Sequence, residues 1–363
     1  MNTCLFEDLM VLELANNHWN DLSRGLKIIS DFAKIVRFNN MRAAIKLQFR
    51  DVDNFIHNDF KNRDDIRYIK KTLATAMSKD DYRILVDAIR ENSCITMATP
   101  FDEASVGLCE ELGIQILKVA SSDINDWILI EEIAKTRKPL VVSTGGSSLK
   151  DVDDIVSFCS KRNIPLALNH CVSLYPSDQE ELELNQIDFL KNRYPGLPIG
   201  FSTHECNDSL AASVMMAYAK GATLIERHID IDHNNIPVSP YCSLPEDIDN
   251  MFKAYNQAKI VCGQPGTSKR LPKKKEIQYL NDLVRGVYAK YDLPAGHALH
   301  DDDIFMAIPL QKGQISCREF MRGEVLLKAC KKGNPVMIDA IDCPYSNIPS
   351  LKQLIFKRGI DPK

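Results

Sequence analysis

The sequence lacks the features that mark several large classes of protein. No apolar stretch approaches the ~20 residues that a membrane-spanning helix needs, and Glu7 and Asp8 stand where a signal peptide would be basic. Lysine and arginine number 45 against 49 acidic residues, so the net charge of −4 leaves no excess positive charge for nucleic acid or an anionic membrane. We therefore expect a cytoplasmic protein that binds neither nucleic acid nor membrane.

Two common cysteine and glycine motifs are also missing. The 11 cysteines are odd in number and include no C-x-x-C pair, which argues against a disulfide framework and against a zinc ribbon. No G-x-G-x-x-G sequence follows an apolar run, and the glycines of STGGSS at 143–148 have a different spacing. A dinucleotide-binding sheet is thereby disfavoured. The 363 residues, 45% of them hydrophobic, suffice for one large domain and a small one.

What the sequence does contain is a repeated pattern of strand followed by helix. Segments with helical periodicity, such as 80–92, 149–163 and 208–221, separate short apolar runs rich in β-branched residues. The runs are residues 11–15, 43–49, 94–101, 116–121, 140–145, 166–172, 198–204 and 223–229. Eight such units predict an α/β fold, a parallel (β/α)8 TIM barrel. The charged stretch 51–71 predicts a long loop with an extra helix over the mouth of the barrel.

The chain changes character after Gly263. Residues 263–276 hold proline, glycine and five basic residues, a composition typical of a linker. Short apolar runs separated by turns then predict a β-rich domain of about 60 residues, too small to bury much surface alone, which is expected to pack on the barrel or on a second subunit. We assign residues 1–265 to the barrel, 266–285 to the linker, 286–345 to the small domain and 346–363 to a C-terminal tail.

Polar residues recur at the ends of the predicted strands, where a (β/α)8 barrel builds its active site. Four hydroxyl residues lie there together with Lys46, which supplies a fixed positive charge. The four are Thr99, Ser121, Ser143 and Ser202. Hydroxyl donors and a lysine suit a phosphate group. Serine and threonine also cap helices, but capping leaves the lysine unexplained. The pattern therefore predicts a phosphorylated small molecule as ligand.

His204 and His228 end the seventh and eighth predicted strands, so both side chains are expected to face the barrel axis from neighbouring positions. Two neutral imidazoles make half of a divalent metal site, which water or substrate oxygens complete. Such a mixture of nitrogen and oxygen ligands suits manganese, cobalt or zinc.

The remaining charged residues at the strand ends allow more than one chemistry. Lys118 is either an electrostatic clamp or a Schiff-base lysine, as in class I aldolases. Glu13, Glu226 and Asp123 are suited to transfer protons or to hold sugar hydroxyls.

Eight short motifs resemble, in chain order, those of the sialic acid synthases. They are Glu13 with Asn17-His18, Lys46-Leu47-Gln48, Thr99-Pro100-Phe101, Lys118-Val119-Ala120-Ser121, Ser143-Thr144-Gly145, His170-Cys171 with Tyr175-Pro176, Gly200-Phe201-Ser202-Thr203-His204, and Glu226-Arg227-His228. The segment after the linker resembles the family's antifreeze-like SAF domain, with Gly323 to Ile338 matching its closing part. The resemblance implies a TIM barrel with a SAF domain. It also implies a synthase that condenses phosphoenolpyruvate with the open-chain aldehyde of an N-acetylated amino sugar, releasing phosphate and giving a nonulosonic acid.

The resemblance also implies roles for single residues. His204 and His228 would bind a divalent metal, Mn2+ foremost, with Co2+, Mg2+ or Zn2+ as alternatives. The residues around phosphoenolpyruvate would be Lys46, Thr99, Ser121, Ser143, Ser202 and Ser173, the last standing where the family has asparagine. Lys118 would face its carboxylate or phosphate, with Glu13 and Asp123 as the other catalytic groups, and Gln48, Tyr175 and Glu226 would lie near the sugar. A domain-swapped homodimer is implied as well.

Several departures from the family pattern lie on the sugar side. Pro237-Val238-Ser239-Pro240 stands where the family has Gly-Pro-Asp-His, so the acid is missing at Ser239. Ile308-Pro309 replaces an Arg-Pro pair in the small domain, Ala15 replaces a glycine, and Trp19-Asn20 replaces Asn-Gly. We expect the reaction to be retained with an acceptor other than plain N-acetylmannosamine. A metal-independent aldolase and a binding homologue without turnover stay open as alternatives.

Overall fold

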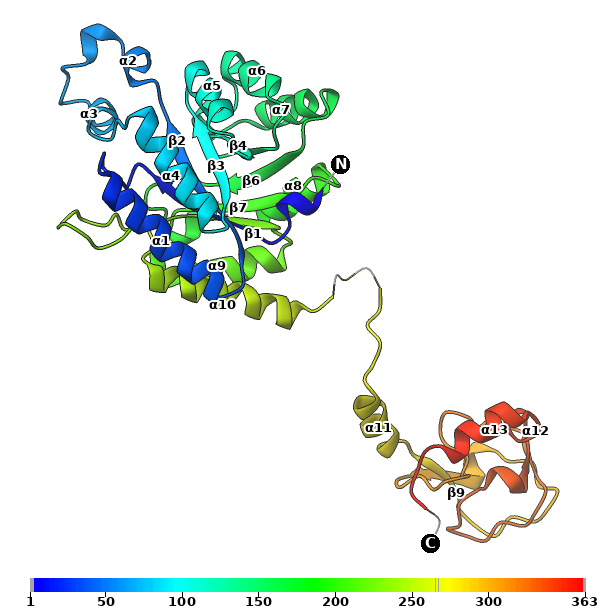
Figure 1. Ribbon diagram of the computed structural model, residues 1–363. Helices are drawn as coiled ribbons and strands as arrows, with labels where there is room; N and C mark the ends of the chain where they lie inside the picture. Colours follow the sequence, from blue (N-terminus) through cyan, green and yellow to red (C-terminus); the bar gives the residue numbers. More distant parts are fainter. Residues whose placement is uncertain (1–2, 265, 267, 362–363) are drawn as a thin grey trace. The chain divides into compact units, whose positions relative to one another are not determined.

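The computed structural model describes residues 3–264, 266 and 268–361, which form two compact units, Met1–Gln264 and Pro265–Lys363 (Figure 1). Residue 267 of the expected linker and residues 362–363 of the expected tail lie outside the described residues. Within the described ranges, every helix is too short or too polar to cross a bilayer.

The first unit is a closed barrel of eight parallel strands in sequential order, which confirms the predicted TIM barrel. The strands are β1 (Leu9–Ala15), β2 (Arg42–Phe49), β3 (Ile95–Pro100), β4 (Ile116–Val119), β5 (Leu140–Ser143), β6 (Leu166–Cys171), β7 (Ile199–Thr203) and β8 (Leu224–His228). Each overlaps one of the predicted apolar runs, because these runs carry the branched side chains that fit a doubly buried parallel sheet.

Helices connect the strands along the outside of the barrel (Figure 1). They are α1 (Leu22–Phe38), α4 (Lys79–Glu91), α5 (Glu103–Glu111), α6 (Trp127–Lys135), α7 (Leu149–Lys161), α8 (Asn185–Arg193), α9 (Asn207–Ala219) and α10 (Pro245–Cys262), with 3-10 turns η1 (Thr3–Phe6), η3 (Ser121–Asp123) and η4 (Gln179–Glu181). Capping residues in the sequence stabilise the first turn of several of these helices. At the start of α7, for example, Ser148 and Asp151 form a capping box: Ser148 Oγ accepts a bond from Asp151 N at 3.2 Å, and Asp151 Oδ2 accepts one from Ser148 N at 3.0 Å. The predicted insertion after β2 contains α2 (Val52–Phe55), η2 (Asn58–Phe60) and α3 (Arg67–Ala74).

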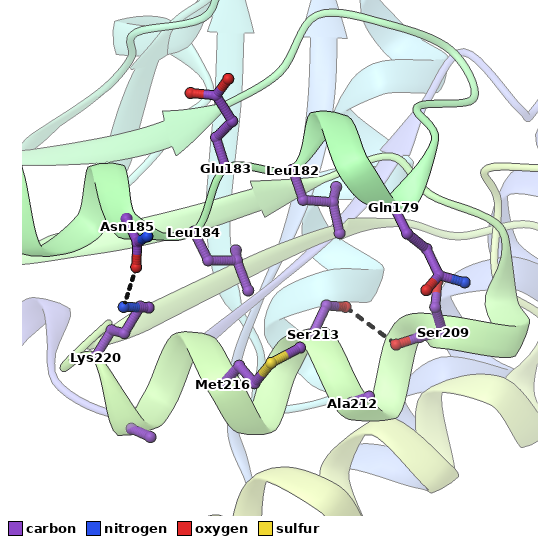
Figure 2. Close-up of a pocket in the computed structure, with 11 residues that line it drawn as sticks. Gln179, Leu182, Glu183, Leu184, Asn185, Ser209, Ala212, Ser213, Met216 and Lys220 are labelled. Carbon is purple, nitrogen blue, oxygen red and sulfur yellow. Dashed lines mark hydrogen bonds between the residues drawn. The ribbon is translucent and has the colours of Figure 1, made fainter.

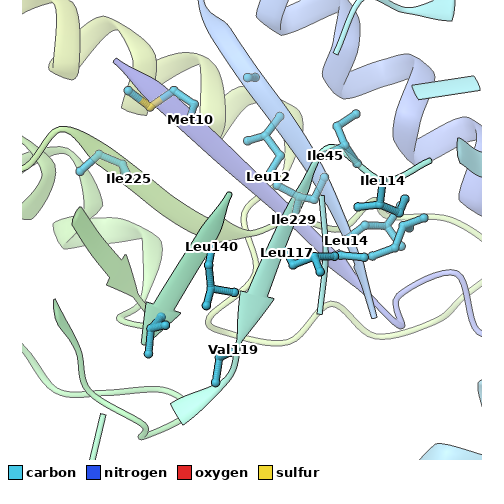
Figure 3. Close-up of a cluster of buried hydrophobic side chains, with 14 of the residues drawn as sticks. Met10, Leu12, Leu14, Ile45, Ile114, Leu117, Val119, Leu140, Ile225 and Ile229 are labelled. Carbon is cyan, nitrogen blue, oxygen red and sulfur yellow. The ribbon is translucent and has the colours of Figure 1, made fainter. Parts of the chain in front are cut away.

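The two faces of each strand belong to different cores, because successive side chains point to opposite sides. Outward-facing residues such as Met10, Leu12 and Leu117 are buried in the large cluster beneath the helices (Figure 3). Inward-facing residues fill the barrel near the start of the strands. They include Leu9, Val11, Ala44, Met97, Ile116, Val141, Ala167 and Leu224. This inner apolar layer closes one end of the barrel interior, and polar residues follow it further along the strands.

The second unit has a core of its own, with Val287, Leu299 and Val336 among its buried residues. It contains α11 (Lys274–Asp282), the antiparallel pair β9 (Gly286–Ala289) and β10 (Ile304–Ala307), the antiparallel pair β11 (Val325–Leu326) and β12 (Ile341–Asp342), and the short helices η5 (Asp301–Asp303), η6 (Ile338–Ala340), α12 (Pro344–Asn347) and α13 (Pro349–Phe356). The structure differs here from two expectations. Helix α11 lies within the expected linker, and the expected tail folds into α13, whose Ile355 is buried in this core.

Candidate active site

A charged layer lies inside the barrel directly beyond the inner apolar layer. Since strand side chains alternate, the residue two places after an inward-facing one also faces the axis. Two residues further along β1, β2, β4 and β8, this position holds Glu13, Lys46, Lys118 and Glu226, each at most 4% exposed. We call these four residues the charge quartet.

The members of the charge quartet pair with one another. Lys46 Nζ contacts the Glu13 carboxylate and lies 3.1 Å from Glu226 Oε1. Lys118 Nζ donates to both oxygens of Glu226, at 3.1 and 3.0 Å, and Asn169 Nδ2 donates to Glu226 Oε2 at 3.1 Å. Glu226, which we expected near the sugar, therefore has both oxygens engaged by the site itself. Each buried lysine thus has an acidic partner within the quartet.

The pKa values of the two carboxyl groups of the quartet are shifted in opposite directions. Burial raises the pKa of Glu13, and the nearby Glu226 charge adds to the rise. Burial alone would also raise the pKa of Glu226, but Lys118 and Lys46 together lower it below its usual value. The pKa of Lys118 is lowered, chiefly by burial, whereas that of Lys46 is raised because Glu13 and Glu226 outweigh burial. Paired carboxyl groups with opposed shifts are the pattern of an acid and a permanent anion sharing one site.

Hydroxyl groups also lie at this end of the strands. Thr99 Oγ1 accepts a bond from Lys46 Nζ at 3.3 Å, and Ser121 Oγ accepts one from Gly145 N at 3.1 Å. A Cβ at Gly145 would lie 2.3 Å from Ser173 Oγ and 2.9 Å from Ser121 Oγ. Only glycine leaves room for Ser121 and Ser173 to converge on this point.

Several buried oxygens of this region have no hydrogen-bond partner in the part of the chain that the structure describes. Among them are Ser143 Oγ, Asn169 Oδ1 and Asp123 Oδ2. A Cβ at Gly200 would lie 2.3 Å from Asn169 Oδ1, so the glycine in β7 makes the space that this amide occupies. Ser202, further along β7, is also buried. Burial raises the pKa of Asp123. Unpaired buried oxygens are costly unless a ligand or water binds them.

The two predicted metal ligands lie together at the mouth of the barrel. The ring centroids of His204 and His228 are 5.3 Å apart. His204 Nδ1 lies 2.9 Å from the carbonyl oxygen of Val172, which makes this nitrogen the donor and leaves Nε2 as the ligand atom. Burial lowers the pKa of His204 to about 4 and lowers that of His228 as well, so both rings are in the neutral form that binds metals.

Across the described ranges, no group of three or more His, Cys, Asp and Glu side chains is arranged to hold a metal ion. A metal bound by His204 and His228, as the sequence predicts, would therefore take its remaining ligands from water or substrate.

The predicted sugar residues occupy two places. Gln48 lies beside the quartet, where its Nε2 donates to Glu13 Oε1 at 3.2 Å. Tyr175 lies at the rim, half exposed, with its ring centroid 4.2 Å from that of His204.

Sequence reasoning missed three residues of the site. Asn169 and Arg50 each lie two residues after an inward-facing position, Ala167 and Gln48, so strand alternation could have identified them. In the structure, Arg50 Nη1 donates to Gln48 Oε1 at 3.2 Å. Tyr241 lies in the segment after β8, where no periodicity points to it. Its ring centroid is 5.3 Å from those of both His228 and Tyr175.

One motif residue faces away from the site. His170 of β6 points outward, where its Nε2 lies 2.7 Å from the carbonyl oxygen of Leu182 and its ring stacks at 6.0 Å from Phe201. Neighbouring side chains of a strand point to opposite sides, so Asn169, the residue before His170, faces the barrel interior.

The departures in the opening motif share one backbone property. Ala15, Trp19 and Asn20 have φ values of 51°, 51° and 59°. This left-handed region favours glycine and, next, asparagine, which are the residues that sialic acid synthases carry at these positions. Ala15 and Trp19 therefore hold this turn at a steric cost.

A separate cavity of about 560 Å³ lies outside the barrel, between the segment 179–185 and α9 (Figure 2). It is lined by Gln179, Leu182, Glu183, Leu184, Asn185, Ser209, Ala212, Ser213, Met216, Ala219 and Lys220. None of the predicted site residues is among them. Ser213 and Lys220 are already bonded within the chain, to Ser209 O and Asn185 Oδ1, so this cavity adds nothing to the charged layer.

Comparisons with known proteins find one matching family and several similar proteins. The model of the NeuB family matches residues 38–266. A crystal structure from Chromobacterium violaceum, provisionally described as spore coat polysaccharide biosynthesis protein E, is 34% identical with a TM-score of 0.86, covering 93% of this chain and 100% of that one. N-acetylneuraminate-9-phosphate synthase from Mus musculus is 27% identical over 73% of either chain. N,N'-diacetyllegionaminic acid synthase from Campylobacter jejuni is 24% identical over 89% of this chain and 97% of its own.

Proposed function

Because the chain belongs to the NeuB family, we propose that it joins phosphoenolpyruvate to the open-chain aldehyde of an N-acetylated amino sugar. The products are a nonulosonic acid, which is a nine-carbon 2-keto acid, and inorganic phosphate. Two similar proteins are named as synthases of such acids, for N-acetylneuraminate 9-phosphate and for N,N'-diacetyllegionaminic acid.

The observation that carries the proposal is the charge quartet with its surrounding hydroxyl groups. Phosphoenolpyruvate has a carboxylate and a phosphate on one small carbon frame, and two lysines only 4% or less exposed face the axis here. In the proposed complex Lys46 and Lys118 bind these anionic groups, and Glu226 keeps both lysines in position and favours their charged forms. The hydroxyl groups of Thr99, Ser121, Ser143, Ser173 and Ser202 surround the phosphate.

The reaction forms one carbon–carbon bond and breaks one carbon–oxygen bond. C3 of phosphoenolpyruvate attacks the aldehyde carbon, and the aldehyde oxygen takes up a proton to become a hydroxyl group. Water then adds to C2, the bond between C2 and the phosphate oxygen breaks, and C2 becomes the ketone as a proton is lost. Glu13, whose pKa is raised by burial, is suited to give the first proton. Asp123, with its unpaired Oδ2, is suited to accept the proton from water.

The neutral imidazoles of His204 and His228 fit a divalent ion such as Mn2+, because the bond of His204 Nδ1 to the Val172 carbonyl oxygen leaves Nε2 to bind it. Co2+, Mg2+ and Zn2+ are the alternatives. When bound, the ion supplies Lewis-acid polarisation of the aldehyde oxygen. Tyr175, whose ring lies beside that of His204, and Gln48, which bonds Glu13, would contact the sugar in this complex.

An assay of phosphate release tests the proposal. The full chain is incubated with Mn2+, phosphoenolpyruvate and, in turn, N-acetylmannosamine, its 6-phosphate and 2,4-diacetamido-trideoxy hexoses. We expect phosphate and keto acid in equal amounts with at least one acceptor, and loss of both on addition of EDTA. Binding of Mn2+ and phosphoenolpyruvate without phosphate release from any acceptor would instead support a binding homologue.

The Schiff-base alternative makes the opposite prediction. A free amine at Lys118 would form a covalent adduct that borohydride traps, and activity would survive EDTA. The two short contacts from Lys118 Nζ to the Glu226 carboxylate favour the ammonium form, which is not a nucleophile.

A further inference from the structure

We infer that Tyr241 is a specificity-determining residue for the acceptor sugar, because its ring forms with that of Tyr175 an aromatic wall beside the histidine pair. The inference rests on the proposed function and deepens it. The wall selects acceptors that present carbon–hydrogen surface to it in place of a hydroxyl group.

The wall is defined by ring contacts. The Tyr241 ring meets the His228 ring edge to face, with centroids 5.3 Å apart and an interplanar angle of 88°. It meets Tyr175 in the same manner at 5.3 Å and 73°, and Tyr175 lies 4.2 Å from His204. The two tyrosines and two histidines thus form a closed circuit of rings. A sugar whose aldehyde reaches the histidine pair on this side passes against tyrosine carbon atoms.

The segment that carries Tyr241 is anchored on both sides of the ring. Asp230 N donates to Ser243 O at 3.1 Å, and Ser243 N donates to His228 O at 2.9 Å. Cys242 N donates to Ser239 O at 2.8 Å, and Cys242 and Ser243 are 2% and 0% exposed. Tyr241 itself stays part-exposed. The backbone next to Tyr241 is therefore held by hydrogen bonds and buried neighbours, while its ring stays accessible to a ligand.

A buried arginine from α1 fixes the other arm of the same segment. Arg24 is fully buried, pairs with Asp230 at 2.6 Å, and donates to the carbonyl oxygens of Ile231 at 3.0 Å and His233 at 2.7 Å. Asn17 Nδ2 adds a bond to Ile229 O at 2.8 Å. These bonds tie residues 229–233 to α1 and to the turn before it, which pre-orders the start of the segment for a ligand.

The ring carbon atoms of Tyr175 and Tyr241 give the wall its apolar surface. The Tyr241 phenol is bonded to the Ser239 hydroxyl, and the carboxylates of Glu13 and Glu226 are engaged by lysines. A sugar hydroxyl packed against the rings loses water and gains no partner, whereas a methyl or methylene group gains contact. One such group in an apolar pocket changes kcat/KM by roughly 10–200-fold.

A deoxy scan tests the inference with the full chain, Mn2+ and phosphoenolpyruvate. The acceptors are N-acetylmannosamine and analogues that each lack one hydroxyl group. We expect the wild type to prefer one deoxy analogue by ~10-fold or more in kcat/KM, and Tyr241→Ala to abolish the preference, mainly by raising KM for that analogue. Tyr241→Phe keeps the ring and is expected to keep the preference. Tyr241→Gln supplies an amide and shifts preference toward N-acetylmannosamine.

Two readouts separate the wall from a general structural role. KM for phosphoenolpyruvate and the affinity for Mn2+, measured by electron paramagnetic resonance of the free ion, are expected to change less than threefold in Tyr241→Ala. Phe38→Ala removes a ring that is 79% exposed at the end of α1 and serves as the matched control, with no effect on preference. A wild type that releases phosphate without preferring any deoxy analogue, or a Tyr241→Ala variant that keeps the preference, overturns the inference alone. Absence of phosphate release with every acceptor overturns the proposed function and this inference together.

Discussion

The charge quartet and the aromatic wall lie in one barrel but are built by different parts of the chain. Quartet residues stand on strands, where register against neighbouring strands fixes each side chain, and Glu13 is directly paired in register with Lys46. Tyr175 and Tyr241 stand in segments that follow strands, and Tyr175 is 53% exposed. The lysines proposed to bind phosphoenolpyruvate are thus held by the sheet, whereas the two tyrosines proposed to meet the acceptor depend on loops, which tolerate substitution. The departures from the sialic acid synthase motifs at Trp19 and Ser239 fall in such loops.

The largest expected effect comes from breaking the quartet. Glu226→Gln leaves Lys46 and Lys118 buried with Glu13 as their only acidic partner in the quartet, so we expect unfolding to cost about 3–5 kcal/mol less. Phosphate release should fall ~10²–10³-fold or more, because both lysines lose their fixed position. Urea denaturation and the phosphate assay measure the two effects. Glu246→Gln at an exposed position of α10 is the control, with a change within about 0.5 kcal/mol. A Glu226→Gln variant with wild-type stability would show that the quartet does not act as a unit.

The next largest effect is expected from the histidine pair at the rim, His204 and His228, and it should differ from that of the quartet. His204→Ala and His228→Ala each remove a nitrogen ligand, and we expect Mn2+ affinity to fall by at least the ~100-fold that loss of an outer-shell partner can cause. Phosphate release should be lost while the circular dichroism spectrum stays unchanged, since strand packing does not depend on these rings. His57→Ala, whose side chain is 71% exposed, is the matched control. Unchanged Mn2+ affinity in either rim variant would refute the metal assignment.

The smallest expected effect lies where β1 passes from the charged layer to the rim. Ala15 has a φ of 51°, so Ala15→Gly should stabilise the protein by about 0.5–1 kcal/mol in urea denaturation. Ala212→Gly, at an exposed position inside α9, should destabilise it by about 1 kcal/mol. Equal signs for the two substitutions would mean that the turn after β1 does not strain alanine.

Much of the fold and of the charged layer follows from the sequence because both depend on strand periodicity. The runs of branched residues predict the barrel, and the polar residues that end them include Glu13, Lys46 and Lys118. The same reasoning did not identify Asn169 in β6, because a short strand does not show which of two adjacent polar residues, Asn169 or His170, faces inward. Tyr241 could not be found in this way, since its position depends on long-range bonds from Arg24 and Asn17.

The second unit shows another limit of sequence reasoning. The segment 346–363 looked like a tail because it is short and follows the last apolar run, yet Ile355 of α13 is buried among residues far from it in sequence. The SAF assignment, the domain-swapped homodimer, the identity of the metal and the roles of the site residues stay predictions.

Part of the space in this site exists because Gly145 and Gly200 have no side chain. Adding a single carbon at either position would place it 2.3 Å from a site oxygen, of Ser173 or Asn169. Substitution at either position would therefore displace a side chain of the site, although neither glycine has a side chain that can touch a substrate. A comparison of relatives that scores only ionisable and nucleophilic side chains would overlook them, and with them the shape of the space that the ligand fills.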